Sequence, residues 1–124
     1  MVADALSGMI ENNKEYIAKL EEKKEKFDEG IELSKKKMHN FLVQRWAFLR
    51  ECGVTDPLHL NREQKLKYEG LTSDYWSAKK SYNFNLCSFL STNNTIFDLV
   101  LDNGKLQCQQ LVFNNIAKNY ESNG

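Results

Sequence analysis

The sequence has few residues that break helices: a single proline, Pro57, and six scattered glycines in 124 residues. A chain so poor in proline is able to form long helices. No run approaches 18 apolar residues, and the N-terminal stretch MVADALSGMIENNKEYI has an early acid and no basic residue before Lys14. We therefore expect neither a membrane-spanning helix nor a signal peptide.

The sequence is also poor in cysteine and histidine. Cys52, Cys87 and Cys108 are odd in number, widely spaced and set in apolar surroundings. This pattern fits small buried hydrophobic residues in a reducing compartment better than a disulfide framework, so we expect an intracellular, cytoplasmic protein. The two histidines are His39 and His59, and the spacing from Cys52 to His59 matches no standard metal motif, so we expect no metal.

The chain lacks net charge and recognisable catalytic motifs. Lysine plus arginine equal aspartate plus glutamate at 17 each, which disfavours nucleic-acid or membrane binding by the molecule as a whole. There is no glycine-rich phosphate loop, GxSxG, HExxH or CxxC. Paired carboxylates such as Glu21 and Glu22 lie in a charged, solvated segment that offers nothing to tune them for acid–base chemistry. We therefore expect that the protein is not an enzyme and has no catalytic residue, no cofactor and no small-molecule substrate.

Apolar residues are present at helical spacing along the first third of the chain. Spacings of four and three alternate from residue 6 to residue 41, which is the pattern of a coiled-coil seam. Apolar side chains fill most positions, and Asn13, Lys24 and Ser34 interrupt them with polar groups that penalise wrong registers. The pattern continues through Val43, Trp46, Leu49 and Cys52 to Gly53, so we expect a helix over about residues 4–52. The seam positions are Leu6, Ile10, Asn13, Ile17, Leu20, Lys24, Phe27, Ile31, Ser34, Met38 and Phe41.

A second helix is predicted over about residues 57–90. Asp56 before Pro57 is a candidate N-cap, and Asn61 with Gln64 is another. An aromatic residue recurs every seventh position, at Tyr68, Tyr75, Tyr82 and Phe89. This stripe could stack against bases, but Leu71 and Ala78 are in phase with it, which favours a buried seam. The polar stretch STNN at 91–94 is expected to end the helix.

The C-terminal part of the chain carries two competing patterns. Helical spacing from Ile96 to Tyr120 predicts a shorter, broken helical segment over about 94–121, whereas Asp102-Asn103-Gly104 is a strong β-hairpin signal. We favour helix. The expected fold is therefore a single all-α domain, residues 1–124: an elongated bundle of two long antiparallel helices plus a shorter, broken C-terminal helical segment. The alternative is a β-hairpin around Asp102–Gly104.

These patterns indicate a non-enzymatic protein-interaction function, as a small helical adaptor, inhibitor or assembly subunit. With helix two ending near residue 90, the start of the first helix would overhang and expose an apolar stripe, so the partner-binding residues would be Leu6, Met9, Ile10 and Ile17. Residues 4–32 hold five lysines against nine acids, whereas residues 35–50 hold five basic residues and no acid. This asymmetry predicts an antiparallel homodimer through the first helix or, failing that, another protein docked on the same stripe.

Nucleic-acid binding is the alternative function. It would use the basic stretch at residues 35–50, with help from the lysines of the second helix. Phosphate contacts release counterions, so the salt dependence of binding separates this alternative from an apolar interface. The candidate phosphate contacts are Lys35, Lys36, Lys37, Arg45 and Arg50.

Overall fold

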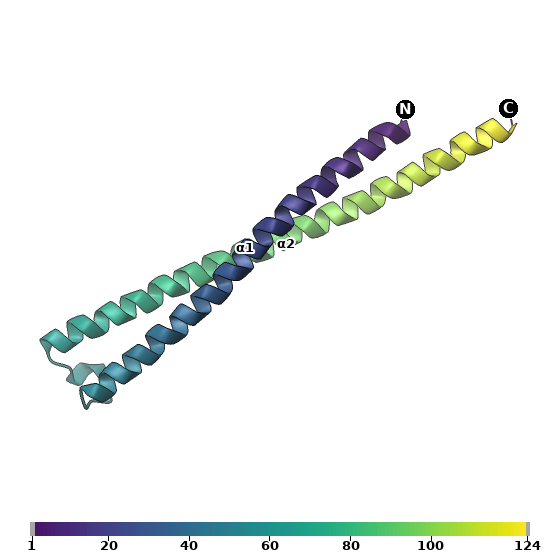
Figure 1. Cartoon of the computed structure of the whole chain (residues 1–124). Coiled ribbons are helices and arrows are strands. Elements are labelled where there is room, and N and C mark those ends of the chain that lie inside the picture. The colour runs from purple at the N-terminus through teal and green to yellow at the C-terminus, as the bar shows by residue number, and fades with distance from the viewer. Residues whose placement is uncertain (1, 124) are drawn as a thin grey trace. The chain divides into compact units, whose positions relative to one another are not determined.

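The computed structural model describes residues 2–123 and contains two long helices. Helix α1 spans Val2–Glu51, a short 3-10 helix η1 spans Pro57–His59, and α2 spans Arg62–Asn123 (Figure 1). None of the described residues is in a β-strand. The all-α prediction is therefore confirmed, and the β-hairpin around Asp102–Gly104 does not form.

The C-terminal end of α1 lies where the sequence placed it. Gly53 has a φ of 72°, the left-handed conformation that ends many helices. Its N–H donates to the carbonyl of Arg50, and the Val54 N–H reaches back to Leu49 at 3.1 Å. This pair of bonds satisfies carbonyls in the last turn that would otherwise lack partners.

The start of α2 is later than predicted. Asp56 accepts a hydrogen bond from the N–H of Leu58, but it caps only η1. The cap of the long helix is Asn61, whose Oδ1 accepts from the N–H of Gln64 while the Gln64 Oε1 accepts from the N–H of Asn61, both at 2.9 Å. This reciprocal capping box fixes the start of α2 at Arg62.

The predicted break at residues 91–94 and the separate C-terminal segment are wrong, because α2 continues through both turn-forming stretches. Their polar side chains bond within or across helices. The Thr95 hydroxyl donates to the carbonyl of Ser91, and Asn93 accepts from the Lys24 amine at 3.2 Å. Asn103 bonds α1 rather than forming a turn. Tertiary contacts thus override the local turn preference.

The contacts divide the chain into two units. The terminal unit joins the chain up to Glu25 with the chain from Leu90 onward, and the central unit is Lys26–Phe89. In the terminal unit, cross-helix hydrogen bonds join Ser7 to Gln110, Asn13 to Asn103 and Lys24 to Asn93. The residue numbers rise along α1 while they fall along α2.

The burial pattern follows the predicted seam. Every seam position from Leu6 to Phe41 is buried or half-buried, whereas nearly all other described positions over that range of α1 are exposed. The seam then passes through Arg45 and Phe48, so the prediction that Trp46 continues it is wrong: Trp46 is 62% exposed. On α2 the same spacing includes Ala78, Ile96 and Asn103, all buried.

In the central unit the two helices approach closely at Gly30. A Cβ placed on Gly30 would lie 2.6 Å from the side chain of Asn85, so glycine permits this approach. The Phe27 and Phe84 rings meet edge to face with centroids 6.4 Å apart. Arg45 donates to the Tyr68 hydroxyl at 2.7 Å, which places a cation inside the seam.

Candidate functional site

Helix α2 of the terminal unit exposes a line of large apolar side chains. Leu90 is 52% exposed, Phe97 62%, Leu101 50% and Leu111 64%. Each exposed leucine or phenylalanine retains apolar area in contact with water, and one such residue alone would be ordinary. Several on one helix form a surface that requires an explanation.

These residues share one face of α2. Together with two smaller exposed residues, they recur at intervals of seven, four, three, four and three positions. Residues at such intervals lie in a row along a helix. The row lies about a third of a helical turn around α2 from the buried Ile96 and Asn103, because Phe97 and Gly104 directly follow these two residues. We call it the outer stripe; its members are Leu90, Phe97, Leu101, Gly104, Cys108 and Leu111.

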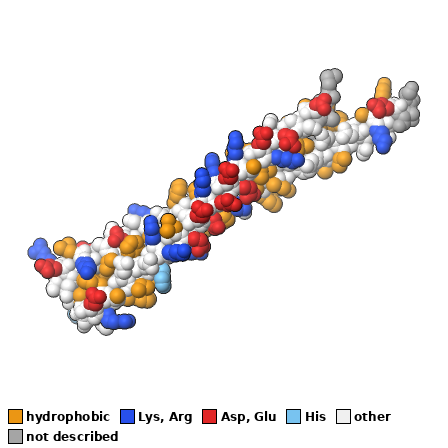
Figure 2. Space-filling view, in the orientation of Figure 1, with side chains coloured by type: hydrophobic (Ala, Val, Ile, Leu, Met, Phe, Trp, Pro, Cys, Tyr) orange, Lys and Arg blue, Asp and Glu red, His pale blue; other side chains and the backbone are white. Residues whose placement is uncertain are grey.

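Helix α1 of the same unit has a different outer surface. Its exposed positions include Glu11, Glu15, Lys19 and Glu22, whereas Asp98, Asp102 and Lys105 are the only charged residues between positions 90 and 117. Figure 2 shows charged side chains gathered over α1 of this unit and hydrophobic side chains on its α2 side. The apolar surface of the terminal unit therefore belongs mainly to α2.

The four predicted partner-binding residues do not form one exposed stripe. Leu6 is 7% and Ile10 5% exposed, and Ile17 is half-buried, because they lie on the seam facing α2. Met9 alone of the four is exposed, at 52%. The inferred overhang is wrong, since α2 runs to Asn123 and covers this part of α1.

The central unit also exposes large apolar groups, but on several faces. Trp46 is on α1, Trp76 and Phe84 are on α2, and Leu58 is in η1. The Trp76 ring contacts Tyr75 edge to face and lies 4.7 Å from the Lys79 amine. The aromatic stripe itself is half-buried at Tyr68, Tyr75, Tyr82 and Phe89, as expected for a seam rather than a free stacking platform.

The five predicted phosphate contacts point in different directions. Lys35 pairs with Glu32 at 3.5 Å, and Arg45 lies over the Tyr68 and Tyr75 rings with its guanidinium hydrogen-bonded to Tyr68. The remaining three, Lys36, Lys37 and Arg50, are all exposed, but Lys36 and Lys37 are consecutive and therefore diverge around the helix. The structure does not bring the five onto one surface.

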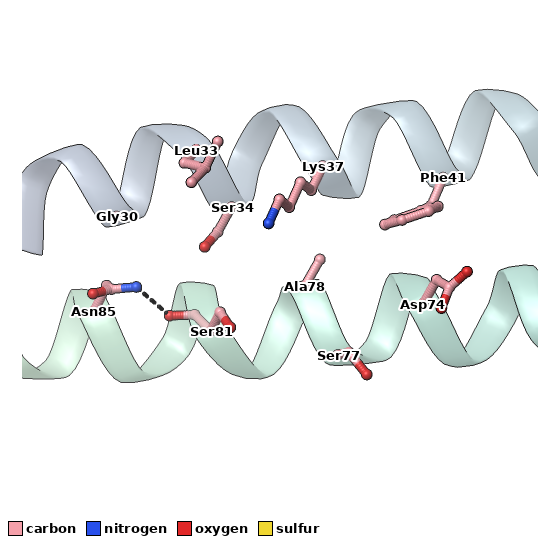
Figure 3. Close-up of a pocket in the computed structure, with 10 residues that line it drawn as sticks. All are labelled: Gly30, Leu33, Ser34, Lys37, Phe41, Asp74, Ser77, Ala78, Ser81 and Asn85. Atoms are coloured by element: carbon pink, nitrogen blue, oxygen red, sulfur yellow. Dashed lines mark hydrogen bonds between the residues drawn. The ribbon is translucent and has the colours of Figure 1, made fainter.

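A groove of about 410 Å³ runs between α1 and α2 in the central unit. Figure 3 shows Ser34 and Ala78 facing across it, with Asn85 donating to the carbonyl of Ser81 at 2.8 Å. The groove exists because small residues oppose each other here: Gly30, Ser34 and Ala78. Lys37 and Asp74 are the charged residues that line it, one from each helix.

The cysteines are free, and two of them are not buried. Cys87 and Cys108 are exposed and Cys52 is half-buried, so the expectation of three buried cysteines is wrong. Among residues 2–123 no group of three or more His, Cys, Asp or Glu side chains is arranged to hold a metal ion. Neither helix, over the described residues, has an apolar stretch of the length needed to cross a membrane.

No protein-family model, curated protein or solved structure matches the chain.

Sequence inspection missed the outer stripe, although its signal is present. The spacing from Leu90 through Phe97, Leu101 and Cys108 to Leu111 is as regular as that of the first helix. The predicted break at residues 91–94 separates Leu90 from Phe97, and the helical spacing from Ile96 to Tyr120 follows a different face of the helix. A helix with two apolar faces also shows a weaker helical periodicity of hydrophobic residues than a helix with one.

Proposed function

We propose that the chain acts by binding protein, as a small helical adaptor, inhibitor or assembly subunit, and not as an enzyme. The observation that carries this proposal is the outer stripe, whose four large side chains are each at least half exposed. Such a connected apolar row is costly in water and is characteristic of an interaction site. Binding would bury it, and the apolar area removed from water would supply the free energy.

The arrangement of the two helices fits this function. We propose that α1 and α2 pair in antiparallel, coiled-coil-like fashion, each using one apolar seam for the other. The falling and rising residue numbers of the Ser7–Gln110 and Asn13–Asn103 hydrogen bonds support this pairing in the terminal unit. One face of α2 packs against α1. The outer stripe remains exposed and would bind a partner, either another chain or a second copy.

The test is capture of partners by the immobilised chain, from an extract of the source cell and from a solution of the chain itself. Phe97→Glu places a charge in the outer stripe and should weaken binding at least about tenfold, because a charge left in an apolar contact is strongly unfavourable. The matched control is Asn12→Glu on the polar surface of α1, which should leave binding unchanged.

Salt provides the second criterion. Apolar contacts should persist when ionic strength is raised from about 0.05 to 0.2 M, whereas binding through phosphates would fall by orders of magnitude. If the captured material were released by salt, and if its binding were unaffected by Phe97→Glu, the proposal would be refuted in favour of the nucleic-acid alternative. Absence of any retained protein would refute it outright.

A further inference from the structure

The outer stripe is self-complementary. We propose that it binds the outer stripe of a second copy of this chain, antiparallel, in one register that sets Asp98 of each copy beside Lys105 of the other. This proposal rests on the proposed function and identifies the partner and the geometry. Both residues are exposed on α2, at positions that flank the stripe on the same side.

Side-chain sizes support this register. In an antiparallel helix pair, the residues of each seam face each other in layers whose residue numbers add to a constant. The proposed register sets Leu101 opposite Gly104 of the second copy and Phe97 opposite Cys108. It sets Leu111 opposite Asn94. Each layer therefore joins a large side chain to a smaller one, which lets the two helices interlock without voids or clashes.

Charge decides between this register and its neighbours. In the proposed register, two symmetric Asp98–Lys105 pairs flank the stripe. Sliding one helix by a heptad in one direction would set Asp98 opposite Asp98 of the second copy, and sliding in the other would set Lys105 opposite Lys105. Like charges directly opposite are destabilising, so one register carries attraction and both neighbours carry repulsion.

A parallel pair is less favourable. It would stack Gly104 on Gly104 of the second copy, leaving a gap in the middle of the stripe, and would bring Lys105 beside Val100 instead of an acid. Nothing within the chain requires glycine at position 104, since an added Cβ would meet no atom within 4 Å. Close approach of a second helix gives that small residue a role.

The stripe has the length of a usable interface. From Leu90 to Leu111 it extends for about 33 Å along α2. The α1 surface of this unit is mostly polar and charged, and its large exposed apolar residues are Val2, Met9 and Tyr16, so α2 offers a second copy the greater apolar area. Val100 and Val112, at 52% and 55% exposed, widen the contact at its edges.

The test is the mass of the full chain measured by multi-angle light scattering over a concentration series reaching about 100 µM. The wild type should approach twice the 14.4 kDa monomer mass. Asp98→Lys alone, or Lys105→Asp alone, should raise the dimer dissociation constant at least about tenfold, because both ion pairs become like-charge pairs. The double swap should restore the wild-type value, and an equimolar mixture of the two single variants should form a heterodimer.

Glu15→Lys on the exposed surface of α1 is the charge-matched control and should leave the mass unchanged. Gly104→Leu should also abolish the dimer while circular dichroism stays helical, whereas Gly8→Leu, at an equally open glycine on α1, should not. A monomeric wild type at 100 µM would overturn the proposal. A dimer indifferent to Asp98→Lys, or not rescued by the double swap, would overturn it as well. The proposed function would fail separately, on the capture experiment.

Discussion

Polar residues inside the seam give individual side chains distinct roles. The amide of Asn13 donates to Asn103 at 2.8 Å, and the Asn103 amide donates to the carbonyl of Ile10 at 3.3 Å. Asn103 is only 7% exposed, so these bonds replace water that the side chain has lost. A buried amide pair of this kind adds little net stability but disfavours other registers, where each amide would lack a partner.

Asn103→Ala should therefore destabilise the chain by about 1–3 kcal/mol, because it leaves the Asn13 amide half-buried without its acceptor. Urea unfolding followed by circular dichroism measures the change. Asn12→Ala, at an exposed neighbouring position, should stay within about 0.5 kcal/mol of the wild type. Equal losses for the two variants would show that the Asn13–Asn103 contact is not formed in solution.

At this scale the sequence predicted which α1 residues are buried, but not what Arg45 and Asn103 do. Leu6, Ile10 and Leu20 follow from spacing alone, since burial requires only a shared face. Arg45 looked like a solvent-exposed cation, and Asn103 looked like a turn residue. Each instead bonds a residue more than twenty positions away, which local spacing cannot reveal.

At the scale of the helices, the sequence shows where α1 ends and which residues cap α2, but not that α2 continues through residues 91–94. Gly53 and the Asn61–Gln64 box act through their nearest neighbours, so the sequence shows them directly. The persistence of α2 through residues 91–94 depends on packing against α1. Intrinsic preference for a turn costs at most about 1 kcal/mol per residue, which tertiary contacts exceed.

Asn94→Pro tests that continuity. Proline in a helix interior removes a backbone hydrogen bond and clashes with the preceding turn, so this variant should lose about 3 kcal/mol or more and much of its helical signal. The exposed Asn94→Ala variant should change stability by less than about half a kcal/mol. If the proline variant unfolded at the same urea concentration as the alanine variant, residues 91–94 would be a break after all.

At the scale of the whole molecule, positive and negative charges balance, but charged and apolar residues are distributed unequally between the two helices. The chain has no net charge, yet the charged residues of the terminal unit are concentrated on α1 and the exposed apolar residues on α2. Such an arrangement keeps one side hydrated while the other is available for contact. The sequence predicted self-association through the first helix from its charges, whereas we propose that a second copy binds the outer stripe of α2.

The most direct test of self-binding through α2 is zero-length carbodiimide cross-linking of an equimolar mixture of unlabelled and ¹⁵N-labelled chain. Mass spectrometry of the digest identifies which carboxylates and amines were joined, and mixed isotopic composition proves that they came from different copies. The account predicts a mixed-label cross-link between Asp98 and Lys105. The account would be contradicted if the cross-links between copies were confined to the charged face of α1. It would also be contradicted if no cross-link between copies formed at the concentrations used for light scattering.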